Sequence, residues 1–238
     1  MRYNNSLTHF EEATSGFENA ARTFLQVLPG GGIIDRGVFG TYDIIQMKRI
    51  EKFMLSMQEL INTGDIQHST LEMLGDYLGN EEGQEYLYLT IDKSKKIRNQ
   101  KKLESLRNLF INHSSCQKPM DIDNAERYLK VMEDLDIEAI LILKFRDSFI
   151  DGTLPNKGTL DFGSIENDTA NNKKVKYLEA VSQELSIDIE DLNYYHQQLI
   201  TCGLIIDDGI GRVGATALQM FAITKRGIQF LAFINSPL

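Results

Sequence analysis

Four polar side chains in the last quarter of the chain have the types and spacing that can read DNA bases. Residues 189–202 are predicted to form the second helix of a helix-turn-helix, the helix that enters the major groove. The outward side of this helix carries four polar residues, Asn193, Tyr194, Gln197 and Gln198. Amide side chains can donate to and accept from adenine. The pattern therefore predicts a contact face, with DNA as one of its candidate partners.

The charge around this helix favours a different partner. Residues 173–205 hold three lysines and five carboxylates, and Glu190 and Asp191 at the start of the helix would repel phosphate. Three basic residues beyond the helix could hold phosphate oxygens, namely Arg212, Lys225 and Arg226. The balance favours packing or protein contact, and DNA reading stays as the alternative.

The most basic stretch lies elsewhere in the chain. Residues 92–107 contain seven cations and two carboxylates. On a helix these cations would spread around more than one side, which favours a solvated surface. Contact with an acidic partner, a nucleic acid or an anionic membrane is the alternative. The seven cations of this basic helix are Lys93, Lys95, Lys96, Arg98, Lys101, Lys102 and Arg107.

No group of residues has the spacing of a catalytic or metal site. The four histidines are scattered, and no His-x-x-x-His or Cys-x-x-Cys pair occurs. The glycines at 30–32 lack the Lys and Ser or Thr of a phosphate-binding loop, so residues 29–40 are predicted to form a Gly-rich turn that packs on the core. Insertion of this turn at a subunit or lipid interface is the alternative. The sequence thus predicts a non-enzymatic protein that needs no cofactor.

Helical periodicity of apolar residues runs through most of the chain. It predicts helices over residues 7–28, 44–61, 65–78, 81–111, 123–131 and 137–149. A switch to Gly, Asp, Asn and Thr predicts a polar loop at about 151–172.

The residues after this loop have the pattern of a winged helix. Two helices are predicted at 176–185 and 189–202, and Asp188 is a candidate N-cap of the second. Strands at 204–206 and 217–223 would enclose a glycine-rich wing, and Thr224 would cap a last helix. The apolar run 137–149 would supply the first helix of this domain.

Bulk composition is that of a soluble globular protein. The chain has 238 residues, of which 42% are hydrophobic and 25% charged, with a net charge of −9. No apolar run is long enough to span a bilayer, and the two cysteines lie too far apart to form a metal knuckle. We therefore expect a cytoplasmic protein with reduced thiols, and a nucleic acid would need a local basic patch to bind it.

Several segments together resemble the abortive-infection alpha family of bacterial proteins. The segments are the Gly-rich turn with Lys48-Arg49-Ile50-Glu51-Lys52-Phe53 after it, the charged helix around Arg98 to Phe110, the segment Leu135 to Leu143, Gly203-Leu204-Ile205, and Ile223-Thr224-x-x-Gly227-x-x-Phe230-Leu231. The resemblance implies a helical N-terminal part, a winged-helix-like end and a role near phage defence. It supplies no catalytic residues.

These observations predict a mainly α protein with a helical domain over residues 1–134 and a winged helix-turn-helix domain with a two-stranded β wing over 135–238. The function they favour is binding of another macromolecule, a protein partner or a second copy of the chain. A winged-helix DNA-binding regulator and a peripheral membrane-associated effector are the alternatives.

Overall fold

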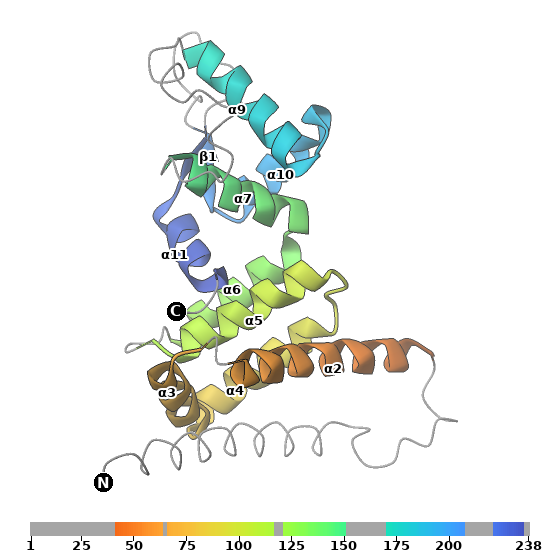
Figure 1. Cartoon of the computed structure of the whole chain (residues 1–238), viewed down its shortest axis with the longest axis vertical. Coiled ribbons are helices and arrows are strands. Elements are labelled where there is room, and N and C mark those ends of the chain that lie inside the picture. Colours follow the sequence, from red (N-terminus) through yellow and green to blue (C-terminus); the bar gives the residue numbers. More distant parts are fainter. Residues whose placement is uncertain (1–40, 64–65, 117–120, 151–169, 208–220, 236–238) are drawn as a thin grey trace. The chain divides into compact units, whose positions relative to one another are not determined.

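The computed structural model describes residues 41–63, 66–116, 121–150, 170–207 and 221–235 (Figure 1). These residues are mainly helical and include a small two-stranded sheet near the C-terminus, as the sequence predicted. The predicted helix 7–28, the Gly-rich turn 29–40, most of the polar loop and the wing with Arg212 lie outside the described residues. The chain divides into two compact units, one of Met1–Glu133 with Phe233–Leu238 and one of Asp134–Ala232. The described residues 233–235 thus belong to the first unit, although they were predicted to lie in the second domain.

The first unit is a group of helices around an apolar core. Its described helices are α2 (Thr41–Asn62), α3 (His68–Leu78), α4 (Glu81–Ser94), α5 (Gln100–Ser114) and α6 (Ile122–Asp134). Helices α2 and α3 both pack against α4 and α5. The side chains that fill this core include Phe53, Met57, Leu74, Tyr86, Phe110 and Leu129, all fully buried.

The predicted helix over 81–111 is wrong in one respect, because the chain forms two helices there. Helix α4 ends at Ser94, and Lys96 and Ile97 then make a tight turn through backbone bonds to Lys93 and Ser94. This turn buries Ile97, and the Asn99 side chain starts α5 by accepting a hydrogen bond from the Lys102 N–H at 3.2 Å. The burial of Ile97 and the N-cap at Asn99 therefore divide the predicted helix into two.

The second unit contains α7 (Ile137–Ile150), α9 (Ala170–Leu185), α10 (Ile189–Thr201), β1 (Ile205–Asp207), β2 (Phe221–Ile223) and most of α11 (Lys225–Ile234). Helix α10 packs against α7, α9 and β1. The two strands are antiparallel, with Ile205 opposite Ile223. Helix α9 begins at Ala170, inside the segment predicted as a polar loop.

Local capping signals position α10 and α11. The predicted N-cap is confirmed, because the Asp188 carboxylate accepts from the Glu190 N–H at 3.0 Å. After α10, Gly203 adopts a φ of 69°, and the Leu204 N–H donates to the Leu199 carbonyl at 2.9 Å, which closes the helix in a Schellman motif. Thr224 accepts from the Gly227 N–H at 3.0 Å and so caps α11, as predicted.

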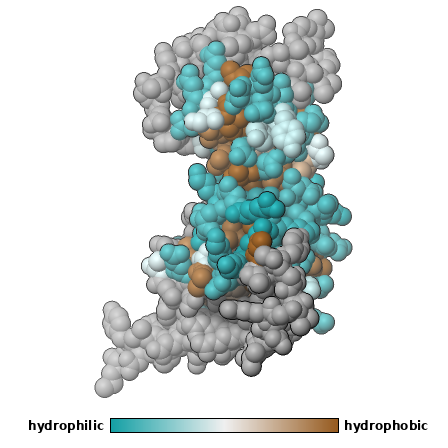
Figure 2. Space-filling view, turned by 90° about the vertical axis from the view of Figure 1, so that its right-hand side faces the viewer, coloured by the Kyte–Doolittle hydropathy of each residue, from teal (hydrophilic) through white to brown (hydrophobic). Residues whose placement is uncertain are grey.

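Hydrophilic residues cover most of the described surface on the side drawn in the space-filling view, and hydrophobic residues show between them in separate patches (Figure 2). Across the described ranges, we find no helix with both the length and the apolar character needed to cross a bilayer.

Candidate functional site

The outward side of α10 is a mixed acidic and aromatic surface. Tyr194 is 58% exposed and Ile189 is 47% exposed, although large apolar side chains are usually buried. Exposed polar and acidic residues surround them. We call this surface the α10 face; it consists of Ile189, Glu190, Asp191, Asn193, Tyr194 and Gln197. Three of the four predicted contact residues therefore lie on it.

Gln198 does not belong to the α10 face, which corrects the sequence prediction. Its side-chain amide donates to the Asp136 carboxylate at 2.7 Å, and its carbonyl oxygen accepts from the Asp136 N–H at 3.0 Å. These two bonds join α10 to the residue that precedes α7. Helical periodicity placed Gln198 outward, but the packing of α7 against α10 covers that edge of the helix.

The predicted phosphate-binding residues are not placed beside the acids of α10. Lys225 and Arg226 are exposed at the start of α11. The Arg226 guanidinium lies 3.7 Å from the position that a Cβ on Gly203 would take, which puts it beside the C-terminal end of α10. Glu190 and Asp191 occupy the other end, about 20 Å away for a helix of this length. The described members of the predicted set therefore lie at the opposite end of α10 from its acids.

A buried histidine lies on the inner side of α10. His196 is 1% exposed, and its ring stacks on Phe221 with centroids 4.1 Å apart. Its Nδ1 lies 2.6 Å from the Leu192 carbonyl, and its Nε2 lies 3.4 Å from the Tyr177 hydroxyl. The short contact with a carbonyl assigns the proton to Nδ1, so Nε2 is the acceptor for Tyr177.

The surroundings of His196 keep its ring neutral. Burial lowers its pKa to about 4, against the opposing effect of the Leu192 carbonyl, and the charge of Arg146 lowers it further. Arg146 lies over the Tyr177 ring, 4.7 Å from the centroid, and donates to the Phe221 carbonyl at 2.6 Å. Burial raises the pKa of Tyr177 to about 12. Both titratable groups therefore stay in their neutral forms near pH 7 and support the position of α10.

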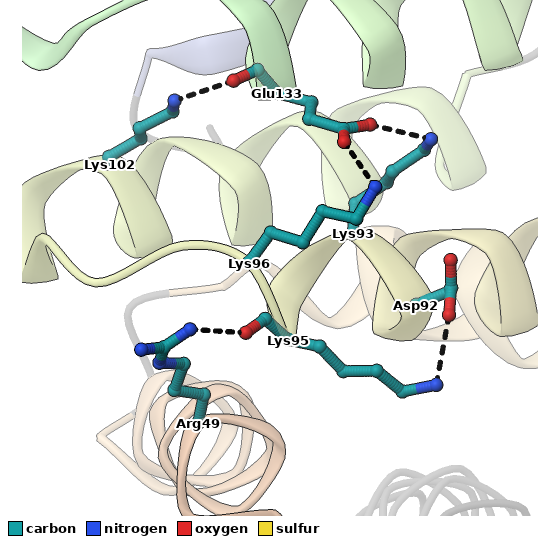
Figure 3. A network of polar contacts seen from close by, with 7 residues as sticks. All are labelled: Arg49, Asp92, Lys93, Lys95, Lys96, Lys102 and Glu133. Atoms are coloured by element: carbon teal, nitrogen blue, oxygen red, sulfur yellow. Dashed lines mark hydrogen bonds and ion pairs between the residues drawn. The ribbon is translucent and has the colours of Figure 1, made fainter. Parts of the chain in front are cut away.

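The basic stretch is divided between α4, the following turn and α5, and several of its cations hold the first unit together (Figure 3). Glu133 on α6 accepts from Lys93 at 2.7 Å and from Lys96, and its backbone carbonyl accepts from Lys102 at 3.0 Å. Burial alone would raise the pKa of Glu133, but the hydrogen bonds and charges of Lys93 and Lys96 lower it to about 2. This network joins α4, α5 and α6.

Two further cations of the stretch also make contacts within the first unit. Lys95 pairs with Asp92 at 2.9 Å, and Arg107 donates to the Ser56 carbonyl at 3.2 Å. The interpretation of the whole stretch as a solvated helix surface is therefore wrong for these residues. Arg98 and Lys101 are exposed, in agreement with that interpretation.

Glutamine at position 133 is expected to destabilise the first unit by about 1 kcal/mol at pH 7, because Lys93 and Lys96 would lose the charge that compensates them, and solvent around the exposed Lys96 screens part of that attraction. The folded pKa lies below the ordinary carboxyl value of 4.5, so the stabilisation is complete above pH 4.5 and is lost as the pH falls toward about 2. Urea denaturation of Glu133→Gln at pH 7 and pH 3 measures both effects. The matched control is Glu126→Gln, an exposed site on the same helix, where no change is expected.

The core of the first unit contains a polar aromatic cluster that the sequence analysis missed. The Tyr86 ring lies 4.4 Å from the His113 ring and 6.5 Å from the Tyr77 ring, centroid to centroid. Burial raises the pKa of Tyr77 to about 12 and that of Tyr86 further. Among the described residues neither tyrosine hydroxyl has a hydrogen-bond partner. Both hydroxyls stay protonated at neutral pH, so neither supplies a general base.

The described ranges contain no group of three or more His, Cys, Asp and Glu side chains that could hold a metal ion. The two cysteines, Cys116 and Cys202, are not joined in a disulfide. The chain matches no protein-family model, no curated protein and no solved structure. The resemblance to the abortive-infection alpha family therefore stays an expectation from sequence.

Proposed function

We propose that this protein acts by binding another protein, and that the α10 face is the contact surface. The partner surface that fits it is basic and offers an apolar recess for Tyr194. The observation that carries the proposal is the exposure of Tyr194 and Ile189 beside Glu190 and Asp191. Tyrosine is enriched among the residues that dominate binding energy at protein interfaces.

The electrostatics of α10 favour a protein over DNA. Glu190 and Asp191 occupy its first turn, and no basic residue occupies its last turn. A groove-reading helix would bring these carboxylates near phosphates, which costs energy at short distance. A protein surface with Lys or Arg would instead gain attraction and a faster association rate.

We further propose that the second unit is a winged-helix module. The order of α7, α9 and α10 followed by two antiparallel strands supports this assignment. Winged-helix and helix-turn-helix scaffolds host unrelated functions, so the partner is argued from the α10 face and not from the fold. A role near phage defence in a bacterium is proposed on the family resemblance alone.

Photo-crosslinking tests the proposal directly. A photoreactive phenylalanine analogue replaces Tyr194 in the full chain, and a second preparation carries it at Tyr88, which is 54% exposed on α4 of the first unit. We expect position 194, and not position 88, to crosslink a protein in the host cell. The captured protein is then purified, and its affinity is measured by calorimetry.

Tyr194→Ala is expected to weaken that affinity about 30-fold, and Tyr88→Ala to leave it unchanged. Equal crosslinking at both positions, or an unchanged affinity of Tyr194→Ala, contradicts the proposal. A duplex DNA shift abolished by Asn193→Ala and Gln197→Ala would replace it with the DNA-binding alternative.

A further inference from the structure

A second surface, in the first unit, brings cations from two distant segments together. The Arg49 guanidinium on α2 donates to the Lys95 carbonyl in the α4–α5 turn at 2.7 Å (Figure 3). This bond fixes the basic segment of α2 beside the basic turn, although the two lie 46 residues apart. We call this region the basic corner, and its exposed cations are Lys48, Lys52, Lys96, Arg98 and Lys101.

The basic corner reverses the charge of the chain locally. Residues 48–52 and 92–104 together with Glu133 contain nine cations and four carboxylates, a surplus of five, in a chain whose net charge is −9. Two of these carboxylates are already neutralised, because Asp92 pairs with Lys95 and Glu133 pairs with Lys93 and Lys96. The surplus positive charge therefore produces a positive potential in the solvent around the basic corner.

Four of the exposed cations have no ion-pair partner among the described residues: Lys48, Lys52, Arg98 and Lys101. Helix α5 begins at Gln100, between the last two, so the positive end of its dipole adds to their field. Burial of Ile97 holds the turn in place beneath them. Several cations held in place without ion-pair partners among the described residues are what the binding of a polyanion requires.

We infer that the basic corner binds the phosphate backbone of a nucleic acid without reading its sequence. A row of phosphates fits cations spread over two elements, since each phosphate can meet a different side chain. The turn offers a bilayer no apolar side chain beside the cations, since Ile97 is only 4% exposed. The exposed apolar residues of α2, Ile45 and Leu55, lie about one helical turn before Lys48 and one after Lys52, outside the basic segment. A protein interface would also require an apolar centre, which this turn lacks.

Fluorescence anisotropy with three labelled nucleic acids tests the inference. The probes are single-stranded DNA, duplex DNA and RNA of mixed sequence, each about 20 nucleotides long. Titrations at NaCl concentrations from about 25 to about 200 mM cover the range in which phosphate contacts control the affinity. We expect the full chain to bind at low salt, with log affinity falling linearly against log salt. Arg98→Gln with Lys101→Gln should weaken binding at least about tenfold and reduce the salt slope by about 2.

The charge-matched control is Arg127→Gln with Lys130→Gln, two exposed sites on α6. It should change the affinity by less than about twofold, because the contacts and not the net charge hold the phosphates. Tyr194→Ala should also bind nucleic acid normally, which separates this result from the protein-binding function of the α10 face.

Three results would overturn the inference. They are no binding of any of the three nucleic acids at low salt, an equal loss in the control pair, and binding to phosphatidylserine vesicles in a co-sedimentation assay without binding to nucleic acid. Circular dichroism of each variant checks that it is folded, and the exposure of all four sites predicts that it is.

Discussion

Alanine at position 83 is expected to lower the stability of the first unit by at least about 3 kcal/mol. Gly83 lies in the first turn of α4, where a Cβ would come within 1.9 Å of the Tyr77 carbonyl oxygen and 2.6 Å of its carbon. Both atoms belong to the backbone at the end of α3, so no side-chain rotation relieves the clash. The helices would have to separate and expose the core around Tyr86.

The matched control for this substitution is Gly75→Ala. Gly75 lies inside α3, and a Cβ there would meet no atom within 4 Å. Alanine has a higher helix propensity than glycine, so this variant should gain about 0.5–1 kcal/mol. Urea denaturation followed by circular dichroism measures both variants. A Gly83→Ala protein as stable as the wild type would show that α3 and α4 do not approach this closely.

The stability of the second unit is expected to fall as the pH drops from about 6.5 to about 4. His196 has a folded pKa of about 4, below its ordinary value of 6.5, because burial disfavours the charged ring. The unfolded chain therefore binds a proton in this range that the folded unit does not. The stabilisation is fully present above pH 6.5, and about 3 kcal/mol is lost by pH 4.

Substitution of His196 by Asn should remove most of this pH dependence, because the amide can still donate to the Leu192 carbonyl but does not titrate. The variant should be less stable at pH 7, since it loses the stacking on Phe221. Hydrogen exchange of α10 amides at pH 7, 6, 5 and 4 provides the measurement. Glu133→Gln serves as the comparison, because the contribution of Glu133 to stability changes with pH only below pH 4.5 and belongs to the other unit. A variant that keeps the full slope between pH 6.5 and 4 would assign the effect to another group.

Sequence patterns were sufficient where the signal is local. The spacing of Leu192 and Leu199 indicated α10, and the residue types at Asp188 and Thr224 indicated the caps that the structure confirms. A cap depends on a side chain and a backbone N–H two or three residues away. Such short-range interactions are readable because the chain itself brings the partners together.

Sequence patterns were insufficient to predict the contacts of a polar side chain that can either face solvent or bind a distant residue. Gln198 has the helical position of an exposed residue, yet it binds Asp136, which lies 62 residues earlier. Lys93 and Lys96 belong to a stretch whose composition is typical of a solvated surface, yet both bind Glu133 on another helix. His196 is polar, and its burial follows from the stacking partner that β2 provides.

For this chain, the order of residues by itself determined the mainly helical class and the helix ends that depend on capping. It also determined the acidic character of α10. Only the tertiary structure decided which polar groups are engaged and which are exposed, because that choice depends on contacts between elements far apart in sequence. The α10 face and the basic corner are therefore defined by packing: one is what remains exposed after Gln198 binds Asp136, and the other exists because Arg49 holds α2 against the α4–α5 turn.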